Sequence, residues 1–227
     1  MRRTLIPFAL LFACHAHAAN QPRAPGIETP GYVWNKADPE TTKALLHKGD
    51  AARGKEAYRV CRGCHKQDGS GLVNGDYPQL AGQLSSVLIK QMADMRAGRR
   101  DNSKMHPFVG MDLVLTDDLA DIAAFLNGLP PPPQIGKGDG KRLERGKELY
   151  KKDCAFCHGK NGEGNAKWFY PKVSQQHYRY LLRQIQEIRE QGRRNSNPDM
   201  IEAAKDYSDR DLEAVSDYMS RLPEAQE

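Results

Sequence analysis

The sequence has relatively few apolar residues and lacks long apolar runs. Hydrophobic residues make up 39% of its 227 residues and charged residues 28%. No stretch of about 18 or more apolar residues occurs, which excludes a permanent transmembrane helix. Strand-like alternation is weak throughout, and no basic stripe of the kind that binds nucleic acid is present. The composition therefore predicts a globular, mostly helical chain with no nucleic-acid partner.

The N-terminus has the pattern of an export signal. Arg2 and Arg3 precede a short apolar stretch at residues 4–13, and an A-x-A cleavage site ends at Ala18. We therefore predict a signal peptide over residues 1–18, cleaved after Ala18, and a periplasmic mature protein. A buried N-terminal helix and a lipid anchor at Cys14 are the alternatives.

The four cysteines that follow the leader form two identical motifs. They stand as C-x-x-C-H with a histidine directly after the second cysteine: Cys61, Cys64, His65 and Cys154, Cys157, His158. In a CxxCH site, two thiols on one helical turn bind the two vinyl groups of a haem, and the histidine becomes an axial ligand of the iron. The motifs thus predict two covalently bound haem c groups.

Three other uses of these cysteines are weaker. Two disulfides are chemically allowed in an oxidising compartment. A zinc site that pools ligands from both motifs would leave two independent repeats unexplained. A thioredoxin-like dithiol expects a βαβ setting, for which the sequence has no signal.

The two halves of the chain resemble each other well beyond the motifs, which are 93 residues apart. The matching segments are 53–58 with 145–150, 68–71 with 161–164, 77–80 with 170–173, 98–100 with 192–194, and 119–130 with 212–223. We therefore predict two homologous domains of roughly 90 residues. The predicted division is a signal peptide at 1–18, an N-terminal arm at 19–48, a first domain at 49–130, a linker at 131–140 and a second domain at 141–227.

Each repeat is predicted to hold three main helices separated by long loops. Residues 85–96 and 178–189 carry apolar positions at helical spacing. The expected N-cap residues of the other helices are Asp50, Asp139, Thr116 and Ser208. Loops this long in a small domain need something to fold around, which haem would supply. The arm, rich in proline and polar residues, is expected to pack loosely.

An electron carrier needs a sixth ligand that closes the iron, and methionine is the usual one. Met200, expected in a loop, is the predicted ligand in the second repeat. In the first repeat Met105 follows Gly98 by seven residues, much as Met200 follows Gly192 by eight, and we predict Met105. The alternatives in this repeat are Met111 and His106.

The other histidines, methionines and two prolines receive supporting roles. An iron-bound histidine normally donates its second ring N–H to an oxygen, and the carbonyls of Pro78 and Pro171 are suitably placed. Three methionines are expected in the cores: Met92, Met95 and Met219. Three histidines are expected at the surface: His47, His106 and His177.

The net charge gives little information about partners. The formal charge is +5, and removal of Arg2 and Arg3 with the leader leaves +3. Four ionised haem propionates would bring the total to about −1.

Two CxxCH domains in tandem, with Tyr-Pro-Gln-Leu-Ala-Gly-Gln at residues 77–83 after the first motif, resemble the cytochrome c4 family over about residues 49–223. The resemblance implies an all-α fold of two class I cytochrome c domains that face each other across a pseudo-two-fold axis. It implies His65 and Met105 as ligands of one iron, and His158 and Met200 of the other. The arm, with its aromatic segment at residues 31–34, is an addition to the family pattern.

The resemblance also implies a function. Members of the family are periplasmic electron carriers, so we expect no enzymatic activity, and peripheral membrane association stays open. The expected donors are a cytochrome bc complex or a periplasmic dehydrogenase, and the expected acceptors are a terminal oxidase or a reductase. The rivals are a two-haem peroxidase, a thiosulfate dehydrogenase, and a dedicated subunit of a larger complex. A thiosulfate dehydrogenase would use a cysteine ligand, and none remains once the four thioethers form.

Overall fold

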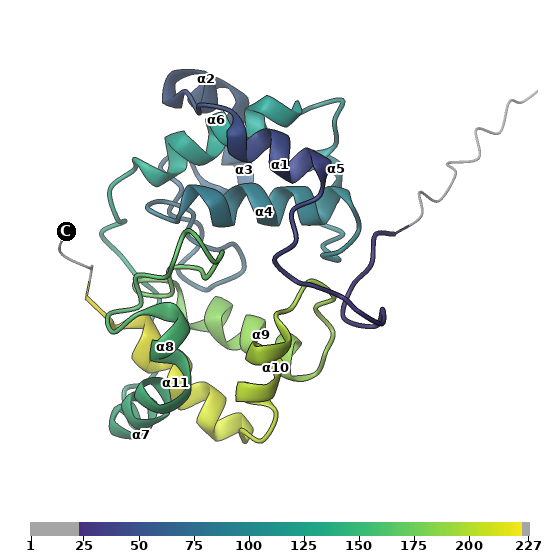
Figure 1. Ribbon diagram of the computed structural model, residues 1–227. Coiled ribbons are helices and arrows are strands. Elements are labelled where there is room, and N and C mark those ends of the chain that lie inside the picture. The colour runs from purple at the N-terminus through teal and green to yellow at the C-terminus, as the bar shows by residue number, and fades with distance from the viewer. Residues whose placement is uncertain (1–22, 224–227) are drawn as a thin grey trace, which may run out of the picture.

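The computed structural model describes residues 23–223, and Figure 1 traces this part of the chain from purple to yellow. The predicted signal peptide and Cys14 lie outside these residues. Within residues 23–223, no helix is long and apolar enough to cross a membrane.

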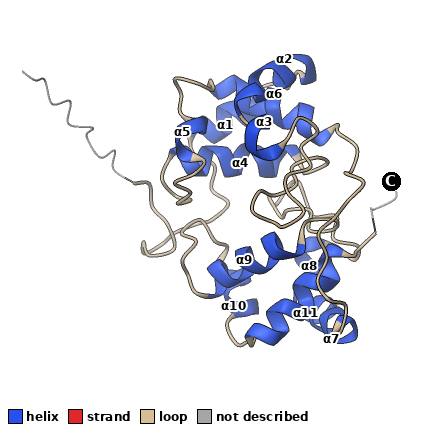
Figure 2. Cartoon of the chain, turned by 180° about the vertical axis from the view of Figure 1, so that it is seen from behind, coloured by secondary structure: helices blue, strands red, loops and turns tan. Residues whose placement is uncertain are grey.

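Two helical halves lie one above the other, with most of the loops gathered between them (Figures 1 and 2). The first half contains α1 (Pro39–Leu46), α2 (Ala51–Ala57), η1 (Tyr58–Val60), α3 (Arg62–His65), α4 (Ser85–Arg96), α5 (His106–Val109) and α6 (Thr116–Asn127). The second contains α7 (Leu143–Leu149), η2 (Tyr150–Cys154), α8 (Ala155–His158), α9 (Tyr178–Arg189), α10 (Pro198–Ala204) and α11 (Asp209–Ser220). Residues 23–223 form no strand beyond one isolated bridge between Asn165 and Tyr170. The prediction of an all-α chain is therefore confirmed.

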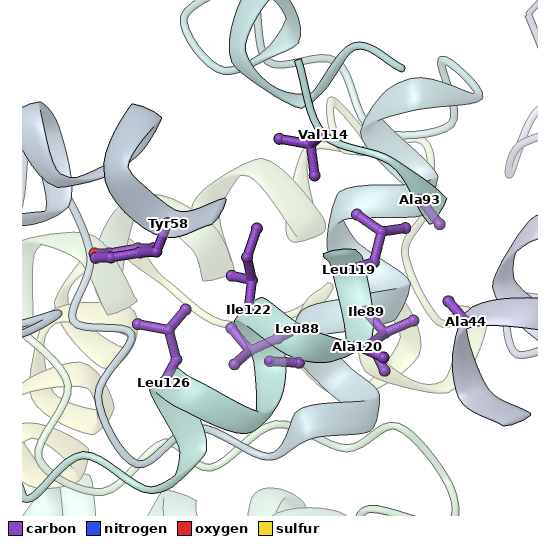
Figure 3. Packing of buried hydrophobic residues seen from close by; sticks show 11 residues of the cluster. Ala44, Tyr58, Leu88, Ile89, Ala93, Val114, Leu119, Ala120, Ile122 and Leu126 are labelled. Atoms are coloured by element: carbon purple, nitrogen blue, oxygen red, sulfur yellow. The ribbon is translucent and has the colours of Figure 1, made fainter. Parts of the chain in front are cut away.

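Each half has its own apolar core. In the first, Leu88 from α4 packs against Ile122 and Leu126 from α6, while Tyr58 closes the side that leads to the first CxxCH motif (Figure 3). The second core repeats this pattern with residues from α7, α9 and α11. Burial of these side chains provides most of the stability of each half.

Two glycines allow the outer helices to cross closely. A Cβ atom on Gly54 of α2 would lie 1.9 Å from the carbonyl oxygen of Asp121 in α6. A Cβ atom on Gly146 of α7 would lie 2.1 Å from the carbonyl oxygen of Ala214 in α11. Each helix pair thus meets backbone to backbone, which any larger residue would prevent.

The helix starts follow the predictions only in part. Asp50 caps α2 by accepting from the backbone N–H groups of residues 52 and 53, and Ser208 caps α11, as predicted. Thr116 is the first residue of α6, and Leu115 is at the N-cap position. The prediction for Asp139 is wrong, because α7 starts only at Leu143. The residues before it are held by Asp217, whose carboxylate accepts from the backbone N–H groups of Gly138 and Gly140.

The second repeat has one extra residue ahead of its motif. Three positions separate Tyr58 from Cys61, and four separate Tyr150 from Cys154. The added residue is accommodated in a π-helical turn at Tyr150–Cys154, where the first repeat has a 3₁₀ turn. A π-turn is the usual way for a helix to absorb an insertion without shifting its neighbours.

The structure also corrects one pairing of the repeats. Gly98 follows α4 with a φ angle of 66°, and the residue that follows α9 with a positive φ of 57° is Gln191. Gly98 therefore corresponds to Gln191, not to Gly192. A constant offset of 93 residues then pairs Arg100 with Arg193.

The two domains meet through matched glutamines. The Gln176 side chain accepts from the backbone N–H of Gln79 at 2.9 Å and donates to its carbonyl at 2.8 Å. The Gln83 side chain makes the same pair of bonds with the backbone of Lys172, both at 2.9 Å. Because Gln83 and Gln79 correspond to Gln176 and Lys172, the contact obeys a pseudo-two-fold axis.

Two arginines extend this symmetric contact. Arg100 donates to the side-chain oxygens of Gln91 and Gln184, both at 2.9 Å. Arg193 donates to the same two oxygens, also at 2.9 Å. Each guanidinium therefore bridges both domains, and the two cations lie close together.

His177, expected at the surface, is fully buried between the domains with 0% exposure, so that prediction is wrong. Its Nδ1 accepts from the N–H of Gly136 in the linker at 3.1 Å. Its Nε2 lies 2.8 Å from the carbonyl of Ser70 in the first domain and donates to it. Acceptance at Nδ1 requires that nitrogen to be unprotonated, so the two bonds together require a neutral ring, and burial lowers the pKa of His177.

The N-terminal arm packs more firmly than predicted. Its helix α1 lies against α4 and α6, and its N-cap Asp38 pairs with Arg99. Glu40 pairs with Arg96, whose side chain is almost fully buried. The expectation of a loosely packed arm is therefore wrong for residues 38–46.

The glycine crossings yield a first prediction. Replacing Gly146 by alanine forces backbone apart at the α7–α11 crossing, and we expect a loss of about 1–3 kcal/mol in the free energy of unfolding. Gly192→Ala is the matched control, because the nearest atom to its Cβ would be 3.7 Å away. Chemical denaturation measures both variants, and equal stabilities would contradict the close-crossing argument.

His177 yields a second prediction. The folded protein holds this ring neutral and the unfolded chain does not, so the folded state binds fewer protons as pH falls below the ordinary value of 6.5. Its contribution to stability is present above that pH and decreases below it. We expect His177→Gln to lose about 1–3 kcal/mol near neutral pH and much less near pH 5.

Denaturation at the two pH values checks this expectation. His106→Gln, a change at an exposed histidine, is the control. A stability difference between His177→Gln and the natural protein that does not change with pH would refute the role of the neutral ring.

Candidate haem sites

The two CxxCH motifs lie on matching short helical segments, η1 with α3 and the end of η2 with α8. Their four cysteines form no disulfide. Burial raises the pKa of the Cys61 thiol to about 11 and that of Cys154 to about 12. A redox dithiol needs a lowered thiol pKa, so these values oppose that interpretation. Within residues 23–223, no three His, Cys, Asp or Glu side chains cluster as a metal site would require, which opposes a pooled zinc site.

The motif histidines are buried and held from one side. The Nδ1 atom of His65 lies 3.2 Å from the carbonyl oxygen of Pro78, and that of His158 lies 2.9 Å from Pro171. Burial lowers the pKa of both imidazoles, while the proline carbonyl acts in the opposite direction. A neutral ring that donates from Nδ1 has its lone pair on Nε2, the atom that ligates iron.

The Nε2 atom of His65 is free to act as an axial ligand. His65 is only 4% exposed, and its Nε2 is buried without a hydrogen-bond partner in the described part of the chain. A buried polar atom without a partner is costly and calls for an explanation. An iron atom bound at this nitrogen supplies one, so the residues present fit a haem group.

Two further glycines make room for the proline carbonyls. A Cβ on Gly71 would lie 2.4 Å from the carbonyl oxygen of Pro78, and one on Gly164 would lie 2.6 Å from the carbonyl carbon of Pro171. The N–H groups of the same glycines donate to the carbonyls of His65 and His158 at 3.1 and 2.8 Å. The two glycines match each other in the repeats. That match indicated a shared role, but the sequence alone did not show which role.

A tyrosine stands beside each histidine. The Tyr77 ring lies 6.0 Å from that of His65, and the Tyr170 ring lies 6.4 Å from that of His158. A second tyrosine braces the turn after each motif: Tyr58 donates to the carbonyl of Lys66, and Tyr150 to that of Gly159. Each site thus has one tyrosine beside its imidazole and a second tyrosine bonded to the turn after the motif.

The predicted methionine ligands are partly buried. Met105 is at the N-cap position of α5, and its competitor Met111 is 63% exposed. Met200 lies within α10 and packs against the second core, so the prediction that it lies in a loop is wrong. Met95 and Met219 are buried and Met92 packs against the first core, as predicted.

The interdomain arginines place two positive charges near each other at the interface. The described residues that accept from Arg100 and Arg193 do so with neutral oxygens. Arg100 is close enough to His65 to help lower the pKa of that imidazole. Burial and the proximity of Arg100 lower the pKa of Arg193 to about 10. A group that brings carboxylates to this region, as haem does, would balance the two charges.

Comparisons with known proteins agree with this arrangement. The Cytochrome c family model matches residues 51–130 and again residues 143–223. Cytochrome c4 of Azotobacter vinelandii is 36% identical over 191 residues, covering 77% of this chain and 90% of that protein. The thiosulfate dehydrogenase electron acceptor of Stutzerimonas stutzeri is 31% identical over 198 residues, covering 78% and 90%.

A solved structure shows the same fold. The crystal structure of reduced recombinant cytochrome c4 from Pseudomonas stutzeri matches with a TM-score of 0.70 and 31% identity, covering 78% of this chain and all of that one. The two family matches, each with its own CxxCH motif, confirm the prediction of two covalently bound haem c groups.

Proposed function

Because the chain belongs to the cytochrome c4 family of two-haem electron-transfer proteins, we propose that it is a periplasmic carrier with histidine and methionine ligands at both irons. The observation that carries the proposal is the buried Nε2 of His65, which has no partner among residues 23–223 while Nδ1 is held by Pro78. His158 has the matching bond to Pro171. Each imidazole is thus oriented by a bond at Nδ1 that leaves Nε2 for the iron.

The proposed ligand sets are His65 with Met105, and His158 with Met200. Cys61 and Cys64 would hold the first haem by thioether bonds, and Cys154 and Cys157 the second. Haem supplies the one-electron chemistry. The protein fixes the ligands, keeps water from the iron and tunes the potential. The strong exposure of Met111 supports Met105 as the sixth ligand in the first domain.

A carrier function is favoured over a haem enzyme. Catalysis at a haem iron needs an open or openable coordination position. Two partly buried methionines, one in each domain, would close both irons. After thioether formation, residues 23–223 also offer no free cysteine as a ligand of the thiosulfate dehydrogenase kind.

The proposed partners are redox proteins. One relative is named as the electron acceptor of a thiosulfate dehydrogenase, which supports a periplasmic dehydrogenase as donor, beside a cytochrome bc complex. A terminal oxidase or a reductase is the proposed acceptor. Export by the predicted signal peptide at residues 1–18 belongs to the same proposal, as does the division into domains at 49–130 and 141–227 with a linker at 131–140.

The weak far-red absorption band that methionine sulfur gives with ferric haem tests the ligands. We expect the natural protein to show this band at both haems. Met105→Ala and Met200→Ala should each remove about half of its intensity, and the double variant should remove all of it. Met111→Ala is the matched control in the first domain and should leave the band unchanged.

Other outcomes are equally readable. Loss of half the band in Met111→Ala would move the first ligand to Met111. A natural protein with one band or none would mean that Met105 or Met200 is not bound at rest, and would favour the enzyme alternative.

A further inference from the structure

The N-terminal arm lies outside the duplicated domains, because the family match begins only at residue 51. Figure 1 shows it passing along one side of the molecule, from the level between the domains to α1. The two haem sites are near copies of each other. An element that is present once is therefore a place where the sites can be made different.

The arm is tied to both domains. In its first part, Ala24 donates from its backbone to the carbonyl of Ala97 in the first domain at 2.9 Å. Ile27 donates to the carbonyl of Arg194 in the second domain, also at 2.9 Å. The Arg194 guanidinium returns to the arm by bonding the carbonyl of Ala24 and the carboxylate of Glu28.

The aromatic segment of the arm contacts one haem site. The Trp34 ring stacks on Tyr170 with centroids 5.7 Å apart and an angle of 12° between the planes. Tyr170 stands beside His158 and directly precedes Pro171, whose carbonyl holds that histidine. Trp34 also contacts Lys90 of α4, whose ammonium lies 5.6 Å from the ring centroid.

The other half of the molecule lacks this insertion. Arg183 corresponds to Lys90 and donates directly to the carbonyl of Gly75, at 2.9 Å, in the loop that leads to Tyr77. Within residues 23–223, the ring contact recorded for Tyr77 is the one with His65. Trp34 thus occupies, on the second site only, a place where the first site has a direct contact between the domains.

We propose that the arm is an interdomain strap and that Trp34 is a positioning residue for the second haem, acting through Tyr170 and Pro171 on His158. This inference rests on the proposed role of His158 as a ligand. The stacked ring covers the Tyr170 side of the site and limits the access of water. A drier site disfavours the more highly charged ferric state, so the strap raises the reduction potential of the second haem relative to the first.

The test is a spectroelectrochemical titration of the full two-haem protein. Trp34→Ala should lower one of the two potentials and leave the other unchanged. The equilibrium constant for electron transfer between the haems should change by up to about tenfold, which is about 59 mV for a one-electron couple. Trp34→Phe keeps a stacking ring and should restore most of the difference.

Trp168→Ala is the control. Trp168 belongs to the second domain, which also holds Tyr170, is 47% exposed, and has a cation–π contact with Lys167. It should shift neither potential. Repeating Trp34→Ala with Met105→Ala, which displaces the potential of the first haem, identifies the haem that Trp34 affects.

Two results would overturn the inference: unchanged potentials in Trp34→Ala, or an equal shift of both. A Trp34→Ala protein that also loses part of the far-red methionine band would show a change of ligand and would count against the positioning role. If Met105→Ala displaced neither potential, the assignment of Met105 as a ligand would fail. Met200→Ala would then mark the second haem, and a Trp34→Ala shift in that haem alone would still support the strap.

Discussion

The hydrogen bond between each motif histidine and a proline carbonyl is the contact on which the rest of each domain depends. It orients the ring and leaves Nε2 as the nitrogen available for the proposed bond to iron. The carbonyl reaches the ring only because Gly71 and Gly164 carry no side chain. Their N–H groups also bind the carbonyls of the same histidines, so the loop and the motif hold each other. The loops between the helices are therefore bonded directly to the CxxCH motifs.

The same loops make the interface between the domains. Gln79 follows the proline that holds His65, and its backbone groups are bonded by Gln176 of the other domain. Gln83 bonds the residue that follows Pro171 in the same way. The same few residues thus hold each histidine in place and hold one domain against the other. Electron exchange between two haems benefits from this coupling, because a fixed separation costs no reorganisation of the protein.

The local features of the fold could be predicted from the sequence, whereas the features that depend on contacts between distant residues could not. The CxxCH spacing, the repeat, and the helices at 85–96 and 178–189 follow from residue type and periodicity, and the structure has them at these bounds. Asp139 failed as a cap because Asp217, distant in sequence, binds the linker backbone. His177 failed as a surface residue because the linker and the first domain cover it. The pairing of Gly98 was a one-residue ambiguity that only the φ angle of Gln191 resolves.

Duplication by itself gives two equal sites, and directional transfer between haems needs a difference between them. The glutamine and arginine contacts of the interface do not provide it, since they repeat under the pseudo-two-fold axis. The differences lie where the repeat is broken: the π-turn before Cys154, the exchange of Lys90 for Arg183, the buried His177 at the position of Leu84, and the arm that has no second copy. Of these, the arm is bonded to both domains and stacks on Tyr170, beside the proposed iron ligand His158. The symmetric glutamine and arginine contacts can therefore hold the haems at a fixed distance while the proposed, unduplicated strap separates their potentials.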